Sequence, residues 1–239
     1  MNKKINIFLG LIFITAFSYI YSSIDVTKTI SEEDKEIKKL LKVDHECSMI
    51  NSFQQEINCI KSIQESQLSL IEGTSCRGKF INLGSIEVIN LNTACCFDRS
   101  RIIEQALQIY GFKGRHVHLN DASKGFFNIA VPGSSSHAAS EVLTSKGWLG
   151  VDSNEPFILL DENNYPNTYA KAISNGLIDF HSEWYLYNKP LTYIIGLYSR
   201  NGTFFEPYLP FIPELNFSDF LGNLFNLKII NPRSNIISI

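Results

Sequence analysis

Residues 92–111 show the clearest helical pattern in the chain. Apolar positions recur every three or four residues, which predicts one buried helix face. The positions on that face are Ile102, Ile103, Ala106, Leu107 and Tyr110. Asn92 or Thr93 can cap the start of this helix, and Gly111 follows the last periodic residue, where helices commonly end. A cysteine, Cys96, therefore falls in the first turn of the predicted helix.

The period changes to strict alternation directly after this helix, which predicts a strand. The alternating positions are Arg115, Val117 and Leu119 on one face and His116 and His118 on the other. The sequence thus predicts a helix that leads into a strand, with a thiol at the beginning of the unit.

A second helix is predicted over residues 51–71. Ser52 and Gln55 have the spacing of a capping box at its start, and Gly73 ends it. Its apolar face consists of Phe53, Ile57, Ile60, Leu68 and Ile71. Gln64 interrupts that face.

Two strand-like runs, residues 136–144 and 148–151, flank a Ser-Lys-Gly turn and predict a β-hairpin. His137 lies near the start of the first strand, and Asp152 follows the end of the second. The open ends of a hairpin's two strands are neighbours in space. We therefore expect these two side chains to come close together, although the sequence leaves the register open.

The remaining segments carry weaker patterns. Residues 126–131 are strand-like, residues 159–180 are irregular or a short helix, and residues 184–198 suit one or two further strands. From residue 201 the chain is rich in Phe, Pro and Leu. We expect this tail to wrap around the domain. Alternatively, the tail offers an apolar surface to a membrane or to a partner protein.

Residues 1–23 have the pattern of a targeting segment. Two lysines precede an almost entirely apolar run, residues 5–16, and small residues at Ala16 and Ser18 offer a weak cleavage site. Without cleavage, the run to Tyr21 is just long enough for a membrane anchor, which needs roughly 17–25 residues. In either case we expect the body of the protein to be exported, with the lysines on the cytoplasmic side.

The composition argues against one class of partner and indicates that the chain folds. The chain of 239 residues has a net charge of −3 and no basic run, which argues against a nucleic-acid partner. Its charged fraction of 19% and apolar fraction of 44% are typical of a folded protein.

We expect one folded domain over residues 46–200. A charged segment, residues 24–45, precedes it as a solvated helix or linker, and the apolar tail, residues 201–239, follows.

The five cysteines are an odd number, so at least one thiol stays unpaired within an exported chain. The simplest assignment pairs Cys47 with Cys59 and Cys76 with Cys95, and leaves Cys96 free. On one continuous helix Cys47 and Cys59 would lie ~18 Å apart, so their bridge requires the chain to fold back before the helix. A free thiol tends to be lost in an oxidising compartment unless it has a use, which favours a functional Cys96.

Cys96, His137 and Asp152 form a candidate set of nucleophile, base and orienting acid. A thiol at a helix N-terminus lies among unpaired N–H groups at the positive end of the helix dipole, and both favour the thiolate. His137 can take the thiol proton, and Asp152 can hold the imidazole in the required tautomer. Each residue also has an ordinary interpretation: a buried or bridged cysteine, a structural histidine and a turn-forming aspartate.

The runs CFDRSRIIEQALQIYGFKGRHV, HAASEV and GWLGVDSN resemble the transglutaminase-like superfamily of papain-type thiol enzymes. The matching positions are Cys96, Asp98, Ser100, Gly111, Arg115, Val117, His137, Glu141, Val142, Gly147, Trp148 and Asp152. The match spans residues 93–156 and looks closest to uncharacterised exported bacterial members with CxDRSR at the nucleophile. The spacing within this motif selects Cys96 over Cys95. Ala139 departs from the family, which usually has an aromatic residue there.

The resemblance implies an α+β fold with a papain-like core, in which a central helix packs on an antiparallel β-sheet. It implies that Cys96 attacks an amide or ester carbonyl to give a thioester, that His137 transfers the protons and that Asp152 orients His137. Water would resolve the acyl-enzyme in a cysteine protease or amidase, and an amine would do so in a transamidase. The sequence does not decide between them.

The expected substrate is a peptide or protein, with an envelope polymer as an alternative, and no cofactor or metal is expected. The expected location is periplasmic or otherwise extracytoplasmic, with anchoring to the inner membrane through residues 1–23 as one option. The sequence leaves open which side chain completes an oxyanion hole.

Two other classes of function compete with this interpretation. One is a non-catalytic module that keeps the scaffold and binds a peptide or polymer. Such members usually lose the cysteine or histidine, whereas this chain keeps all three positions. The other is a metal-dependent hydrolase: His116 and His118 share a strand face, but no third ligand has the spacing of a zinc site. Asp98 and Arg99 are expected to support the helix start and not the chemistry.

Overall fold

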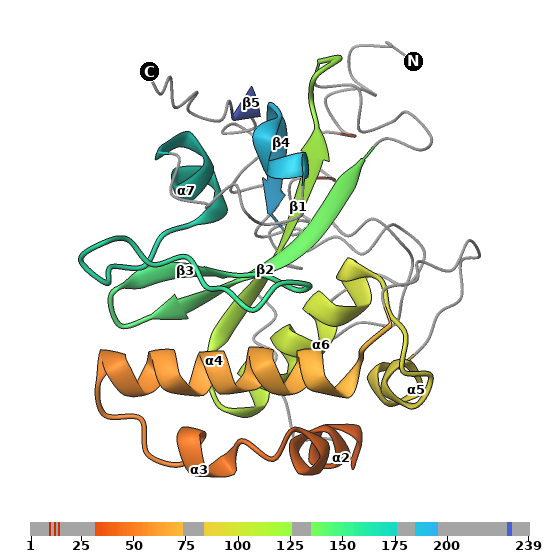
Figure 1. The fold of residues 1–239 in the computed structure, drawn as a ribbon, viewed down its shortest axis with the longest axis vertical. Coiled ribbons are helices and arrows are strands. Elements are labelled where there is room, and N and C mark those ends of the chain that lie inside the picture. The colour runs from red at the N-terminus through yellow and green to blue at the C-terminus, as the bar shows by residue number, and fades with distance from the viewer. Residues whose placement is uncertain are drawn as a thin grey trace.

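The computed structural model describes residues 32–73, 84–125, 135–175 and 185–195, the backbone of Ile229–Ile230, and Gly10, Ile12 and Ile14. The elements follow the order α2 (Glu32–Leu41), α3 (Asp44–Cys47), α4 (Phe53–Leu70), α5 (Ser85–Asn90), α6 (Cys96–Ile109), β1 (Lys113–Asp121), β2 (Ser136–Thr144), β3 (Gly147–Val151), α7 (Tyr169–Asn175), the 3-10 helix η2 (Tyr185–Asn188), β4 (Leu191–Ile195) and β5 (Ile229–Ile230) (Figure 1).

Several predicted segments fall outside the described residues. They are the strand-like run of residues 126–131, the targeting segment of residues 1–23 apart from its three isolated positions, and the tail from residue 201 apart from the β5 backbone. Within the described part of the chain, none of the helices has the length and apolar character that crossing a bilayer requires.

The strands form one antiparallel sheet in the order β3-β2-β1-β4-β5. The predicted hairpin is confirmed: β2 and β3 pair with Ser140 opposite Val151, and their turn lies at Ser145 and Lys146. The prediction of one or two strands within residues 184–198 is also confirmed in part, because β4 pairs with β1. The start of that region differs, since residues 185–188 form η2 instead of a strand.

Helices cover both faces of the sheet, so the fold belongs to the α+β class, as predicted. On one face α4 and α6 pack on the sheet through a buried cluster that includes Ile60, Ile103 and Val142. On the other face α7 and η2 pack on β1 and β4 through a second cluster that includes Leu119 and Tyr169. Figure 1 shows α7 on the opposite side of β2 and β3 from α4.

The central helix α6 begins later than the sequence pattern indicates. The predicted cap at Asn92 or Thr93 is wrong, because Cys95 is the N-cap residue and its backbone N–H donates to Asp98 Oδ2 at 3.1 Å. Thr93 instead forms a β-bridge with Gly73, which keeps this segment extended. A Cβ on Gly73 would lie 2.8 Å from the Asn92 carbonyl oxygen, so this close pairing requires glycine.

The end of α6 and the start of α4 follow the sequence pattern. Gly111 has a φ of +84°, the left-handed conformation that commonly stops a helix. At the start of α4, Ser52 accepts the backbone N–H of Gln55 through its hydroxyl at 3.3 Å, as predicted. The predicted interruption at Gln64 is confirmed, since this polar residue lies on the buried face of α4, and Gln67 is buried on that face as well.

Residues 32–41 form a helix, as one of the two interpretations of the charge run predicted, but this helix is not fully solvated. They form α2, whose Ile37 and Leu41 lie one helical turn apart and are buried in the core. The buried Asp34 accepts a hydrogen bond from Gln105 of α6 at 2.8 Å. The charge run therefore lies on the outer face of an amphipathic helix.

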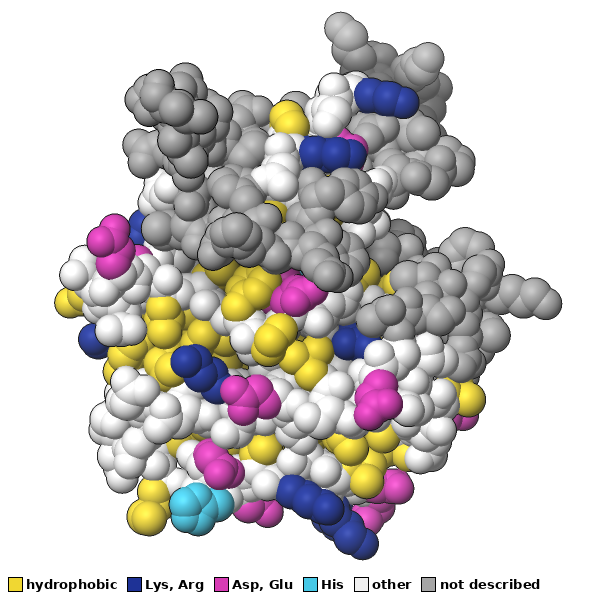
Figure 2. Space-filling model, in the orientation of Figure 1, with side chains coloured by type: hydrophobic (Ala, Val, Ile, Leu, Met, Phe, Trp, Pro, Cys, Tyr) yellow, Lys and Arg dark blue, Asp and Glu magenta, His cyan; other side chains and the backbone are white. Residues whose placement is uncertain are grey.

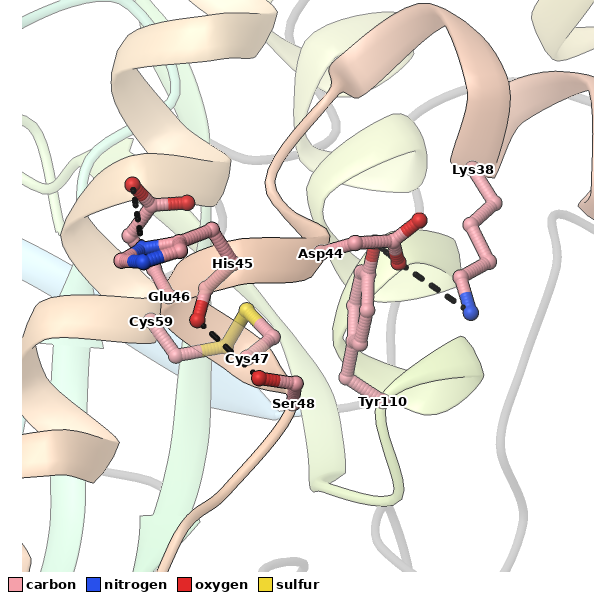
Figure 3. Close-up of a disulfide and its surroundings, with 8 residues drawn as sticks. All are labelled: Lys38, Asp44, His45, Glu46, Cys47, Ser48, Cys59 and Tyr110. Carbon is pink, nitrogen blue, oxygen red and sulfur yellow. Dashed lines mark hydrogen bonds and ion pairs between the residues drawn. A yellow bond between two sulfur atoms is a disulfide. The ribbon is translucent and has the colours of Figure 1, made fainter.

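The chain folds back between α3 and α4, and this reversal allows the predicted Cys47–Cys59 disulfide (Figure 3). The two Cα atoms lie 4.9 Å apart. Cys95 is also disulfide-bonded, while its predicted partner, Cys76, lies outside the described residues. Cys96 is a free cysteine, as predicted.

The disulfide region is also tied to its neighbours by polar contacts, visible in Figure 3. Tyr110 at the end of α6 donates to Asp44 at 2.9 Å, and Lys38 of α2 pairs with the same carboxylate at 3.1 Å. On the molecular face in Figure 2, Lys and Arg side chains are interspersed with Asp and Glu over the described residues.

Candidate active site

Cys96 is the first residue of α6, and its side chain is partly exposed. The neighbouring residues support the helix start, as predicted. Asp98 bonds the N-cap backbone, and the buried Arg99 donates to the carbonyl oxygens of Ile71 and Gly73 at 2.8 and 3.0 Å. The end of α4 therefore holds the first turn of α6 and the thiol in a fixed position.

His137 and Asp152 lie at the open end of the β2–β3 hairpin, where the sequence pattern predicts them to meet. The imidazole Nε2 lies 3.0 Å from Asp152 Oδ2, and both side chains are fully buried. Burial raises the pKa of Asp152, but the charge and hydrogen bond of His137 and further hydrogen bonds outweigh it and lower that pKa to about 2. The carboxylate is therefore ionised, and the imidazole must be the donor of this hydrogen bond.

Cys96 and Asp152 both interact with the His137 imidazole. Burial lowers the pKa of His137, but the charge and hydrogen bond of Asp152, followed by the hydrogen bond and charge of Cys96, raise it overall to about 10. The three residues singled out from the sequence are therefore brought together. At neutral pH the imidazole between them is protonated.

The Asp152 carboxylate accepts hydrogen bonds at both oxygens. The backbone N–H groups of Asn154 and Glu155 donate to Oδ1 at 2.8 and 3.0 Å. Two phenols join His137 at Oδ2: Tyr187 at 2.5 Å and Tyr169 at 3.0 Å. Burial, followed by the charge of Asp152, raises the pKa of both tyrosines well above the usual value. Both therefore act as donors.

The two tyrosines form a compact aromatic unit next to the histidine. Their rings stack at a centroid distance of 6.1 Å, and the Tyr187 ring lies 5.9 Å from the His137 ring in a perpendicular arrangement. Tyr169 begins α7, and its backbone N–H donates to Glu141 Oε1 at 2.8 Å. The sequence pattern does not point to either tyrosine. They stand 17 and 35 residues beyond Asp152, in segments without a motif or a strong period.

The loop that carries Asp152 is anchored by side chains from two other elements. Gln64 of α4 donates through its amide to the carbonyl oxygens of Asp152, Glu155 and Phe157 at 2.7–3.0 Å. The Ser153 hydroxyl donates to the Ala138 carbonyl oxygen of β2 at 2.6 Å. The backbone at Asp152 is therefore fixed from the helix side and from the hairpin side.

A second histidine–carboxylate pair lies between α6 and the sheet. His116 Nδ1 lies 2.9 Å from Glu104 Oε1, which also accepts the Ser140 hydroxyl at 2.8 Å. Burial, reinforced by the charges of His116 and His137, lowers the pKa of His118 to about 3, so this imidazole is neutral. Within the described ranges no three His, Cys, Asp or Glu side chains gather in a group suited to a metal ion.

Comparisons with known proteins add little to this geometry. No protein-family model matches the sequence, and the search of curated proteins finds no match. One solved structure, described as the crystal structure of a TGase, aligns with a TM-score of 0.34 and 14% sequence identity. The alignment covers 65% of this chain and 40% of that chain. A TM-score this low supports no inference about fold or function.

Proposed function

We propose that this protein is an exported transglutaminase-like thiol enzyme with a papain-like core. Cys96 is the nucleophile, His137 the acid and base, and Asp152 the residue that orients His137. The observation that carries the proposal is the environment of one imidazole. A buried, ionised carboxylate lies 3.0 Å from Nε2, and a free, partly exposed cysteine lies close enough to raise the pKa of the same ring.

The geometry supports a thioester mechanism with a balanced transfer of protons. In the resting pair the proton lies on His137, because Asp152 and Cys96 both raise its pKa. The thiolate attacks the substrate carbonyl, and the α6 N-terminus presents backbone N–H groups to the developing oxyanion. The imidazolium then protonates the leaving amine or alcohol, and a thioester on Cys96 remains.

The second half of the reaction restores the resting state. Neutral His137 takes a proton from an incoming water or amine, which attacks the thioester carbonyl and releases the Cys96 thiolate. Water gives the hydrolysis expected of a protease or amidase, and an amine gives transamidation. Asp152 stays ionised throughout, since its pKa is lowered to about 2.

Exposure supports a substrate that reaches the sulfur from solvent. Cys96 is partly exposed, while the side chains of His137 and Asp152 are fully buried, so Cys96 is the member of the set that a substrate can approach from solvent. A peptide or protein, or an envelope polymer with amide bonds, fits this access. The Cys47–Cys59 disulfide supports an oxidising, extracytoplasmic location, where residues 1–23 would have directed the chain or tethered it to the inner membrane.

The proposal is tested by the alkylation rate of Cys96 with iodoacetamide near neutral pH, followed by intact mass and peptide mapping. Only a few per cent of an ordinary thiol is ionised there, so a thiol held as the thiolate should react at least about tenfold faster than N-acetylcysteine. The His137→Gln substitution should abolish this advantage, because it removes the group that holds the thiol proton.

His116→Gln is the matched control, because it also removes a buried imidazole that is paired with a carboxylate. A folded His116→Gln variant should keep the fast alkylation. If wild-type Cys96 reacts no faster than N-acetylcysteine and His137→Gln changes nothing, the protein is not a thiol enzyme. The non-catalytic binding module would then be the better interpretation.

A further inference from the structure

One oxygen of the orienting carboxylate serves three side-chain donors. Asp152 Oδ2 lies 3.0 Å from His137 Nε2, 3.0 Å from the Tyr169 hydroxyl and 2.5 Å from the Tyr187 hydroxyl. A carboxylate oxygen has about two lone-pair sites, so the phenols compete with the imidazole for the same electron density. The shortest of the three contacts has the length of a strong, charge-assisted O–H···O⁻ bond.

The phenol hydroxyls are directed at this carboxylate and are not needed to fill the core. Both tyrosines are fully buried in the cluster on the α7 side of the sheet, where a phenylalanine ring would supply the same apolar contacts. The Tyr187 ring also lies 5.9 Å from the His137 ring. Its hydroxyl and its ring therefore contact the two members of the same ion pair.

We propose that Tyr187, assisted by Tyr169, is a positioning residue that limits how strongly Asp152 holds the His137 proton. The inference rests on the proposed function, since it concerns the same imidazole. Each phenol withdraws part of the carboxylate's charge from the imidazolium. With the phenols in place, Asp152 still orients the ring, but His137 gives up its proton to the leaving group more readily.

The sign of the effect separates this role from a merely structural one. When the Tyr187 hydroxyl is removed, the Asp152 oxygen has one strong donor fewer and attracts the imidazolium more strongly, so the pKa of His137 rises. If the phenol only held Asp152 in place, its loss would loosen the His137–Asp152 contact. The pKa of His137 would then stay unchanged or fall towards its ordinary value of 6.5.

The test is a pH titration of the His137 ring nitrogens by NMR in the full-length protein labelled with ¹⁵N-histidine. The His137 resonance is assigned with the His137→Gln variant. Tyr187→Phe should shift the His137 titration upward by about one pH unit, the size expected for one hydrogen bond to a charged group. Tyr169→Phe should shift it in the same direction by less, because its contact with Asp152 is longer.

Tyr193→Phe is the matched control. The Tyr193 hydroxyl also donates to a carboxylate, but to Glu141 at 3.0 and 3.1 Å, so its removal should leave the His137 titration in place. An unchanged or lowered His137 titration in folded Tyr187→Phe overturns the inference, as does an equal rise in Tyr193→Phe. If Tyr187→Phe fails to fold, Tyr169→Phe decides by the same criteria.

The result of the His137 titration can be separated from the result of the Cys96 alkylation experiment, which tests the proposed function. Repeating the titrations with Cys96→Ala in every variant removes the thiol from the measurement but leaves Asp152 and both phenols. Upward shifts in that background support the phenol effect whatever the alkylation rate of Cys96 proves to be. Fast alkylation of Cys96 with no such shift leaves the thiol enzyme intact and overturns the role of Tyr187.

Discussion

Two histidine–carboxylate pairs are buried among the described residues, and their neighbours determine what each can do. His137 with Asp152 and His116 with Glu104 have nearly equal separations, 3.0 and 2.9 Å. The His116 pair is enclosed between α6 and the sheet and also bonds Ser140. The His137 pair lies beside a free, partly exposed thiol. An imidazolium with a reactive partner is therefore found at one of the two pairs only.

The raised pKa of His137 predicts a specific dependence of stability on pH. The folded state raises this pKa from 6.5 to about 10. The histidine therefore contributes its full stabilisation below pH 6.5 and loses it as the pH rises towards 10. The free energy of unfolding of the wild type, minus that of His137→Gln, should decline across this window. Urea denaturation at a series of pH values measures both quantities.

The ionisation of the Cys96 thiol must not contribute to this difference in the free energy of unfolding. Both proteins therefore carry Cys96→Ser. Asp152 still raises the pKa of His137 in this background, so the decline still begins near pH 6.5, but it is complete at a lower pH because the contribution of Cys96 is absent. Asp152 does not interfere, because its pKa is lowered to about 2 and it stays ionised throughout. A stability difference that is constant from pH 6.5 to pH 10 would show that the fold does not raise the pKa of His137.

At the residue scale, the sequence predicts those partners that local pattern brings together. His137 and Asp152 meet because a hairpin joins them, and Cys96 begins a helix whose periodicity is visible. Tyr169 and Tyr187 could not be predicted, because their contacts with Asp152 depend on how α7 and η2 pack on the far side of the sheet. The periodicity of the sequence in these segments does not indicate how they pack.

Among the elements, α4 has two buried glutamines on one face, and only one of them supports the site. Gln64 donates to the loop that carries Asp152. Gln67, one turn further along and equally buried, has neither amide atom hydrogen-bonded within the described part of the chain. In the helical periodicity of the sequence, both glutamines are polar residues on an apolar face. Their different hydrogen-bond partners depend on how the loop after β3 packs against α4, which the periodicity does not indicate.

The glutamine pair allows a controlled prediction at the scale of the element. Gln64→Leu should lower the free energy of unfolding by about 1–3 kcal/mol, because it leaves buried carbonyl oxygens without their donor. Gln67→Leu should be neutral or stabilising, since it removes a buried amide that has no hydrogen-bond partner among the described residues. Chemical denaturation measures both changes. Equal losses in the two variants would contradict the assigned role of Gln64.

The element boundaries show the same limit of local pattern. The cap of α4 at Ser52 follows from a local motif and is predicted correctly. The start of α6 is displaced because a distant residue, Gly73, pairs with Thr93 and keeps the chain extended up to Cys95. The core residues of α2 were hidden in a charge run, because two apolar positions on one face are a weak signal.

On the scale of the whole molecule, Glu141 connects elements that are far apart in sequence. Its side chain is fully buried and accepts hydrogen bonds from Arg115 of β1 at 2.6 and 2.9 Å. It also accepts the Tyr193 hydroxyl of β4 and the backbone N–H of Tyr169 at the start of α7. Arg115 stacks on Trp148 of β3 at 3.8 Å. One carboxylate thus joins the sheet to the helix that carries a tyrosine of the site.

The charge of its partner makes Glu141 harder to replace than Glu104 on the opposite face. A guanidinium cannot lose its proton, so Glu141→Gln leaves an unpaired charge on Arg115, whose side chain is only 14% exposed. We expect a loss of about 3–5 kcal/mol in the free energy of unfolding. In Glu104→Gln the new amide can still hydrogen-bond the His116 imidazole, which unlike a guanidinium carries no permanent charge, so the loss should be smaller, about 1 kcal/mol. Urea denaturation of the two variants at one pH makes the comparison. Similar losses would mean that the buried charge on Arg115 does not govern the stability of this fold.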